Sequence, residues 1–258
     1  MYLDAIVARH RQAASTDVRS TADLIATCAS LDPPRGFRRA LAEESRTRLA
    51  VIAEIKRRSP SRGDLLGARS IESLVDDYVA GGASCVSVLT DSESFGGSED
   101  DLRAVRSRAG LPVIRKDFTV SLNDVVDARL MGADCVLLIA AVLSRAEMAD
   151  MIDVARTLGL DVLVETHDDN EVRLAVDLGA DMIGVNQRDL VTFEVDHERA
   201  VRTAASIPTG VVKVAESGVR GASDARSLRD AGYDAILVGE SLVTASNPRE
   251  ALDALRVH

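Results

Sequence analysis

The hydrophobic positions of the chain follow two alternating patterns. Short runs of apolar residues, typical of buried strands, begin near Val51, Leu111, Asp161 and Val211 and lie within GGASCVSVL, MGADCVLLI, LGADMIGVN and AGYDAILVG. Between these runs, apolar residues recur every three or four positions, as on one face of a helix. The pattern therefore predicts that strand and helix alternate eight times in about 205 residues.

The last four segments are copies of one repeat. They share Gly82, Gly132, Gly179 and Gly232, which are 50, 47 and 53 residues apart. Each glycine follows a helical stretch and precedes an apolar run, the place where a glycine lets a helix turn tightly into a strand. Each repeat spans two strand–helix units, so the repeats predict that these units follow one another at regular intervals along the chain.

The predicted fold class is α/β, a closed (β/α)8 TIM barrel with additional N-terminal helices. A doubly wound open sheet is the alternative, but the spacing is even and the sequence has no dinucleotide-binding fingerprint. Residues 1–258 are expected to form a single barrel domain, with 1–45 as a helical extension that flanks, plugs or covers the barrel at 46–258. The predicted barrel helices are Ile71–Ala80, Glu99–Ala109, Leu122–Met131, Arg145–Leu158, Asn170–Leu178, Glu198–Ala205, Ser223–Ala231 and Pro248–Arg256.

Charge and composition narrow the classes of function. The formal net charge of −10 argues against general binding to nucleic acid or to anionic membranes. The first residues include acids and lack the apolar core of a signal peptide, and no apolar stretch is long enough to span a bilayer. Three scattered cysteines fit the reducing cytoplasm, and the four histidines show no metal-ligand spacing. We expect a cytoplasmic protein without a metal and without an obligatory protein partner.

Polar residues gather where the predicted strands end. In VIAEIKRRSPSRG, Glu54 and Lys56 are two residues apart, so they share one face of a strand that is otherwise apolar. Barrel enzymes place their active sites at this end of the strands, and buried charges there need each other or a ligand. The other strand ends contribute Lys116, Glu165, Asn186, Arg188, Glu216, Ser217, Gly239 and Ser241.

Lysine is rare in this chain and unevenly placed. Of the 31 basic residues only Lys56, Lys116 and Lys213 are lysines, and each lies in or at the end of a predicted strand. A partly buried lysine can transfer a proton, whereas arginine stays charged. Lys56 and Lys116 are therefore predicted to serve chemistry, with chance placement as the alternative. Lys213, in mid-strand, is expected to form a structural ion pair.

The segments AESGVRG and VGESL, at the ends of the last two strands, indicate a phosphate site. Ser217, Gly218, Gly239 and Ser241 are small residues that expose backbone N–H groups, and barrels commonly hold phosphate in these two loops. Glycine and serine also mark plain turns, so the prediction rests on the pair of segments. Glu240 would repel a phosphate and is expected to point away from it.

The motifs KRRSPS, RKDF, GVNQRDL and VAESGV occur in this order, together with LDAIVARHR near the N-terminus and LVGESLV near the C-terminus. With these motifs the chain resembles the indole-3-glycerol phosphate synthase family over nearly its whole length. The resemblance implies a (β/α)8 barrel of the tryptophan pathway. It also implies conversion of 1-(2-carboxyphenylamino)-1-deoxyribulose 5-phosphate into indole-3-glycerol phosphate, CO2 and water, without metal or organic cofactor.

The resemblance also implies roles for individual residues. Lys116 is similar to the principal general acid, and Lys56 to a second lysine that neutralises the substrate and shares in proton transfer. Glu165 resembles the acid/base carboxylate, and Glu54 a carboxylate that binds substrate hydroxyls or removes a proton, so the sequence leaves open which of the two is the base. The implied substrate-binding residues are Ser59, Phe95, Phe118, Leu137, Asn186, Arg188 and Glu216, and the implied phosphate cradle is Ser217, Gly218, Gly239 and Ser241.

One departure and one long loop stand out against the family pattern. Asp124 occupies a position where the family often has glutamine, which bears on the packing of the following helix. The loop from Arg57 to Ser70 is long for this fold and is predicted to close over the substrate, with Pro60 stiffening it. Its alternative is a disordered loop whose Arg57, Arg58 and Arg62 are solvated.

Two other functions stay open. One is a different phosphate-binding barrel enzyme, such as a sugar-phosphate isomerase or another lyase of the same pathway. The other is a barrel that has lost turnover and serves as a binding or scaffold subunit. The combination of Lys56, Lys116 and Glu165 argues against both.

Overall fold

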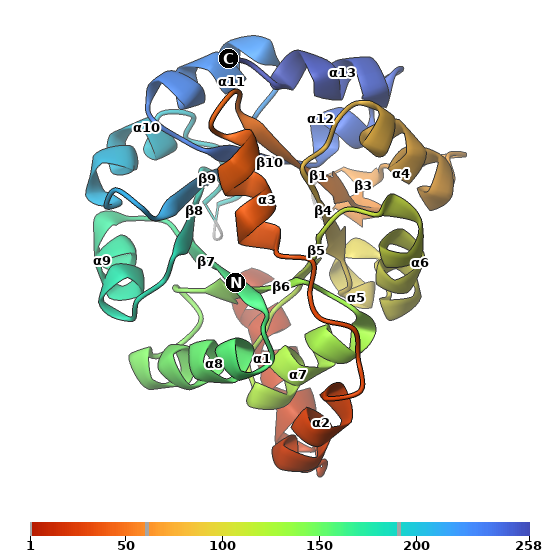
Figure 1. The fold of residues 1–258 in the computed structure, drawn as a ribbon, viewed down its shortest axis with the longest axis vertical. Helices are drawn as coiled ribbons and strands as arrows, with labels where there is room; N and C mark the ends of the chain where they lie inside the picture. Colours follow the sequence, from red (N-terminus) through yellow and green to blue (C-terminus); the bar gives the residue numbers. More distant parts are fainter. Residues whose placement is uncertain (1, 60–61, 190–191) are drawn as a thin grey trace.

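A closed barrel of parallel strands forms the centre of the protein (Figure 1). The computed structural model describes residues 2–59, 62–189 and 192–258. Within those residues the barrel has eight strands in the order β1-β10-β9-β8-β7-β6-β5-β4, which confirms the predicted fold. The strands are β1 (Ala50–Ile55), β4 (Cys85–Leu89), β5 (Val113–Lys116), β6 (Cys135–Ile139), β7 (Asp161–Thr166), β8 (Met182–Asn186), β9 (Val212–Glu216) and β10 (Ala235–Val238).

Helices surround the barrel and connect successive strands (Figure 1). They are α4 (Ile71–Ala80), α6 (Glu99–Ala109), α7 (Leu122–Met131), α8 (Arg145–Thr157), α9 (Asp169–Asp177), α10 (Arg199–Thr203), α11 (Ala222–Asp230) and α13 (Pro248–Leu255). The helix predicted at 198–205 is divided, because the 3-10 helix η1 (Ala204–Ser206) follows α10. Two short helices, α5 (Ser92–Phe95) and α12 (Glu240–Val243), and a hairpin of β2 (Arg58–Ser59) and β3 (Gly63–Asp64) are additional.

The ends of the helices are fixed by local chemistry. Ser70, Ser98 and Ser121 each accept, through the side chain, a hydrogen bond from the backbone N–H three residues later. Asp124 accepts in return from the backbone N–H of Ser121 at 2.9 Å, which completes a capping box. The departure at Asp124 therefore supports the start of α7, which has its predicted bounds.

The repeat glycines take the conformation that their position predicts. Gly82, Gly132, Gly179 and Gly232 have φ angles of 85°, 95°, 73° and 89°. Residues with a Cβ rarely adopt this left-handed region, so glycine allows each helix to turn directly into the next strand.

Three helices precede β1 in the described part of the chain: α1 (Tyr2–Ser15), α2 (Thr21–Cys28) and α3 (Phe37–Glu44). Figure 1 shows α3 across the near end of the barrel and α1 fainter, on the far side. Phe37 and Leu41 of α3 are fully buried against inward residues of the barrel, including Ile52 and Ile114. The helix α3 thus closes the amino-terminal end of the barrel. No helix among the described residues is long and apolar enough to cross a membrane.

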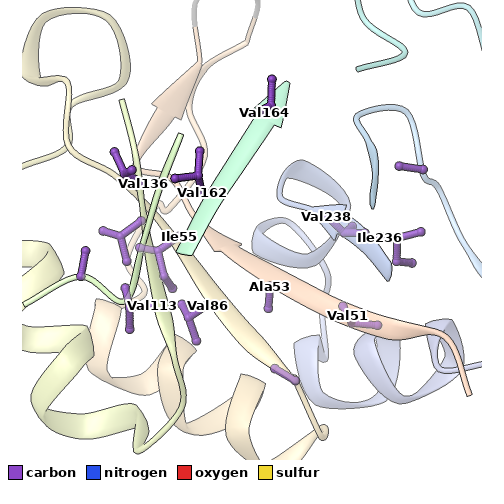
Figure 2. Close-up of a cluster of buried hydrophobic side chains, with 14 of the residues drawn as sticks. Val51, Ala53, Ile55, Val86, Val113, Val136, Val162, Val164, Ile236 and Val238 are labelled. Atoms are coloured by element: carbon purple, nitrogen blue, oxygen red, sulfur yellow. The ribbon is translucent and has the colours of Figure 1, made fainter. Parts of the chain in front are cut away.

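Side chains of β1 alternate between two buried environments. Val51, Ala53 and Ile55 belong to the cluster between barrel and helices, which Figure 2 shows with Val86, Val113 and other branched residues of neighbouring strands. Ala50 and Ile52 instead belong to the interior cluster. Glu54 and Lys56 continue this inward series, so they lie above the apolar interior at the mouth of the barrel.

Lys213 does not form the ion pair that we expected. Its neighbours Val212 and Val214 face the barrel interior, so Lys213 faces the surrounding helices. There its ammonium donates a hydrogen bond to the carbonyl of Ala204 at 2.8 Å, and no ion pair of Lys213 occurs within the described residues. The end of α10 leaves carbonyl groups without helical partners, and Lys213 satisfies one of them.

Replacing Phe37 with alanine tests the role of α3. Because the ring is fully buried between helix and barrel, we expect Phe37→Ala to lower the free energy of unfolding by about 3–5 kcal/mol. Chemical denaturation monitored by circular dichroism measures this change. Val18→Ala is the control, since Val18 is 97% exposed. If the two variants unfolded with equal free energies, the packing role given to α3 would be wrong.

Candidate active site

The inward residues at the carboxyl ends of the strands line one cavity of about 410 Å³. All of the predicted site residues line it: Glu54, Lys56, Ser59, Phe95, Lys116, Phe118, Leu137, Glu165, Asn186, Arg188, Glu216, Ser217, Gly218, Gly239 and Ser241. They lie in, or follow, the barrel strands β1, β5, β6, β7, β8, β9 and β10, while β4 contributes Leu89 to the lining and Phe95 comes from the helix after it. The barrel therefore brings together side chains that are as much as 187 residues apart, from Glu54 to Ser241.

Lys116 lies at the centre of the polar groups. Its Nζ is 2.9 Å from Glu165 Oε2 and 3.6 Å from Glu216 Oε2. Asn186 donates a hydrogen bond to the other oxygen of Glu165 at 2.9 Å. Burial lowers the pKa of Lys116, but the carboxylates of Glu165, Glu216 and Glu54 raise the pKa more, so the amine stays protonated.

The two carboxyl groups beside Lys116 differ in protonation. Burial raises the pKa of Glu165, but Lys116 and His167 lower the pKa further, to about 2. Burial and the nearby Glu165 raise the pKa of Glu216 to about 8. Glu216 is farther from the ammonium, and its Oε1 has no hydrogen-bond partner among the described residues. The site therefore presents an ionised Glu165 and a protonated Glu216 at neutral pH.

Two glycines make room for the carboxylates. A Cβ on Gly184 of β8 would overlap Oε1 of Glu216, and a Cβ on Gly239 would lie 2.5 Å from Oε1 of Glu54. Any larger residue at either position would push a carboxylate out of its place. No local pattern marks Gly184 in the sequence, because the need for space there arises only when β8 and β9 are neighbours.

Glu54 and Lys56 form the second charged pair at the mouth. Lys56 Nζ is 2.8 Å from Glu54 Oε1, and Ser87 donates to Oε2 of the same carboxylate at 3.3 Å. Glu54 is buried, whereas the side chain of Lys56 is 18% exposed. The ammonium of Lys56 is thus the part of this pair that reaches toward solvent and toward an incoming anion.

The ends of β9 and β10 form two adjoining turns. Ser217 and Gly218 have φ angles of 65° and 76°, and Gly239 precedes α12. The hydroxyl of Ser241 donates to the carbonyl of Val219 at 2.9 Å, which joins the two turns. Glu240 lines the cavity as well, and our expectation that its carboxylate points away from a bound phosphate stays a prediction. An ion pair with Arg62 at 2.9 Å neutralises its charge there.

Comparison with known proteins identifies the family. The family model described as indole-3-glycerol phosphate synthase matches residues 3–255. Indole-3-glycerol phosphate synthase 2 of Streptomyces coelicolor is 46% identical over 238 residues, which cover 92% of this chain and 91% of that protein. The chain belongs to the indole-3-glycerol phosphate synthase family. The synthase of Beutenbergia cavernae is 51% identical over 204 residues, which cover 79% of this chain and 76% of that protein.

Members of the indole-3-glycerol phosphate synthase family are carboxy-lyases of tryptophan biosynthesis, and this chain is an enzyme of that class. Solved structures of other enzymes share its fold at low identity. The 3-hexulose-6-phosphate synthase of Salmonella typhimurium has a TM-score of 0.66 at 15% identity, covering 80% of this chain and 96% of that one. The thiamine phosphate pyrophosphorylase of Pyrococcus furiosus has a TM-score of 0.59 at 17% identity, covering 80% and 93%. These likenesses support the barrel fold alone.

The helix α1 contributes to the cavity in a way that the sequence did not predict. Leu3 and Ile6 line the cavity although they precede the barrel by more than 40 residues. His10 Nε2 lies 2.9 Å from Asp91 Oδ2, and its ring centroid is 5.6 Å from that of Phe118. Arg9 also pairs with Asp91. These contacts fasten α1 over the mouth, one of the places that the sequence analysis left open.

Three residues that are far apart in the sequence form a group of possible metal ligands in the structure. His10, Asp91 and Asp117 each bring a ligand atom within 4.8 Å of the others. Arg9 pairs with Asp91, and Arg115 pairs with Asp117 at 3.1 Å, so guanidinium groups already neutralise both carboxylates. We interpret the group as an ion-pair network that anchors α1.

The arginines of the long loop after β1 are held by partners. Arg57 pairs with the buried Asp101 at 2.7 Å, and Arg58 donates to the carbonyl of Ser92 at 3.1 Å. Arg62 pairs with Glu240, yet the side chains of Arg57 and Arg62 are 44% and 65% exposed, so these arginines have partners and also remain in contact with solvent. Closure of the loop over a substrate stays a prediction. The predicted stiffening by Pro60 lies outside the described residues.

Glycine 184 offers a test of how finely Glu216 must be placed. We expect Gly184→Ala to displace the Glu216 carboxylate and to lower kcat roughly 10²-fold, because small misplacements in a reacting site have effects of that size. Steady-state kinetics of indole-3-glycerol phosphate formation measure the change. Gly221→Ala is the matched control, since a Cβ there meets nothing within 4 Å. Similar kinetics in both variants would rule out the steric role.

The protonation of Glu216 predicts a dependence of stability on pH. Because folding raises the pKa of Glu216 from its ordinary 4.5 to about 8, the folded state binds more protons between these values. The contribution of Glu216 to the free energy of unfolding is therefore complete below pH 4.5 and disappears as the pH rises through 8. Relative to Glu216→Gln, the wild type should therefore lose up to about 1.4 kcal/mol per pH unit in this window. Urea denaturation across the window tests this, and parallel curves for the two proteins would refute it; exposed Glu43→Gln is the control.

Proposed function

We propose that the chain closes the indole ring of 1-(2-carboxyphenylamino)-1-deoxyribulose 5-phosphate and releases CO2 and water by lysine and glutamate acid–base catalysis. The observation that carries the proposal is the contact of the Lys116 ammonium with Glu165 and Glu216, at 2.9 and 3.6 Å, in the cavity of an enzyme of this family. The named relatives support the same reaction.

Ring closure requires a proton donor. In this step a carbon of the aromatic ring attacks the substrate carbonyl, and the carbonyl oxygen takes up a proton as the new C–C bond forms. Lys116 is the general acid in our proposal, because surrounding carboxylates keep its ammonium form. Glu216, protonated at neutral pH, donates a second hydrogen bond to a substrate oxygen.

Decarboxylation and dehydration follow from the closed ring. After attack the ring is cationic, so the C–C bond to the carboxylate breaks, CO2 leaves and the bonding electrons return to the ring. Loss of water then needs an acid at the hydroxyl, which is Lys116 after its amine has taken up a proton from solvent, and a base for the proton on the neighbouring carbon of the new ring. Glu165 serves as the base because it is ionised, and Glu54 binds the substrate hydroxyls beside Lys56.

The remaining residues orient the substrate in our proposal. The turns at Ser217, Gly218, Gly239 and Ser241 hold the phosphate, and Lys56 offers a positive charge to the substrate carboxylate or phosphate. The aromatic ring lies in the slot of Phe95, Phe118 and Leu137. Ser59, Asn186 and Arg188 contact the sugar chain and the anthranilate group. The partner is thus a small phosphorylated molecule.

Incubation of the purified protein with the carboxyphenylamino deoxyribulose phosphate is the direct test. We expect an increase of indole fluorescence and stoichiometric release of CO2. Turnover of sugar phosphates without the aromatic ring, and none of this substrate, would favour another phosphate-binding barrel enzyme. Binding of the substrate without any product would favour a scaffold.

Removal of Lys116 tests the proposed general acid. We expect Lys116→Ala to lower kcat by about 10²- to 10⁴-fold, which is the usual contribution of a positioned acid or base. Inorganic phosphate should still bind, because the phosphate turns lie on β9 and β10, away from β5. Fluorescence assays and calorimetric titration measure the two effects.

The control for this variant is Lys213→Met, which removes the amine that faces the outside of the barrel. Its activity per folded molecule should equal that of the wild type. Turnover near the wild-type rate in Lys116→Ala would exclude the role given to Lys116.

A further inference from the structure

His167 lies directly behind the proposed base. It follows β7, two residues after Glu165, and its side chain is only 14% exposed. Nε2 is 3.7 Å from Glu165 Oε1, whereas Lys116 lies beside the other oxygen, Oε2. Nδ1 is 3.1 Å from Oε2 of Glu171 in the first turn of α9. The imidazole thus lies between a buried carboxylate and one nearer to solvent.

The contact with Glu171 fixes which ring nitrogen carries a proton. Oε2 of Glu171 also accepts from the backbone N–H of His167 at 2.7 Å, so this oxygen is held as an acceptor. Nδ1 therefore carries the hydrogen. Nε2 is buried without a hydrogen-bond partner among the described residues. A lone pair on Nε2 would face the Glu165 carboxylate and be repelled, whereas an N–H on Nε2 is attracted.

The other charged groups around the ring are few. Arg199 of α10 opposes a positive charge on His167, but its guanidinium lies 3.8 Å from Asp189 and donates to the carbonyl of Asn186 at 3.1 Å. Burial lowers the pKa of His167, and the two glutamates raise it more, so the net direction is upward. Geometry and charge agree on the imidazolium form.

We propose that His167, as an imidazolium, is a positioning residue that keeps Glu165 ionised and oriented during turnover. The inference rests on the proposed function, in which Lys116 turns to the substrate and donates its proton. At that stage Glu165 loses its nearest positive charge, and a buried carboxylate without a counter-charge takes up a proton. His167 supplies the charge that Lys116 withdraws, so Glu165 remains a base.

The pH dependence of kcat tests this role. In His167→Gln we expect the acid limb of the kcat profile to move to higher pH by about one unit, because loss of a nearby cation makes a carboxylate easier to protonate. Glu171→Gln, which leaves the imidazole in place, should move the limb in the same direction by less. KM should change little, since neither residue lines the cavity. The control is His258→Gln, whose exposed ring contacts the carbonyl of Thr47.

A second measurement does not depend on activity or on the stability of a variant. Nitrogen-15 NMR of the wild-type protein, with the His167 signals assigned from a variant, should show both ring nitrogens protonated at pH 7. A neutral ring at this pH, or an unshifted acid limb in His167→Gln, would overturn the inference. Absence of synthase turnover in the wild type would instead overturn the proposed function, so the two failures are distinguishable.

Discussion

The structure depends on the balance of charge at the mouth of the barrel. Two ammonium groups, on Lys56 and Lys116, lie among the carboxyl groups of Glu54, Glu165 and Glu216. Unpaired charges at this depth would each destabilise the fold by several kcal/mol. Within this group of five, a proton on Glu216 leaves two positive and two negative charges. In the proposed reaction two of these groups, Lys116 and Glu165, supply the acid and the base.

The regular geometry of the barrel places these charges. Along β1, successive inward residues change from Ala50 and Ile52 to Glu54 and Lys56, so one strand passes from apolar interior to reacting site. Outward residues remain apolar along the whole strand and pack against the helices. Because β5, β7, β8 and β9 likewise change from apolar inward residues to Lys116, Glu165, Asn186 and Glu216, the fold combines an apolar support with a polar mouth in a single barrel.

Much of this arrangement follows from sequence. Strand alternation and repeated glycines predict the barrel, and the strand ends then predict which side chains meet, as Lys116 and Glu165 do. Other features depend on contacts that no local pattern encodes. Lys213 donates to a backbone carbonyl and not to an acid, Glu240 pairs with Arg62 of the loop after β1, and His10 of α1 contacts Asp91 after β4. Each of these depends on a partner from another element.

The helix α3 also limits the route by which substrate and products can enter and leave the cavity. Phe37 and Leu41 pack with the inward apolar residues at the amino-terminal end of the barrel. The cavity at the other end is therefore closed at its base. Within the described residues, substrate and products therefore share the opening at the mouth of the barrel, beside α1. In the proposed reaction the phosphate turns retain the phosphorylated intermediate while CO2 and water leave, so the product has to depart before the next substrate binds.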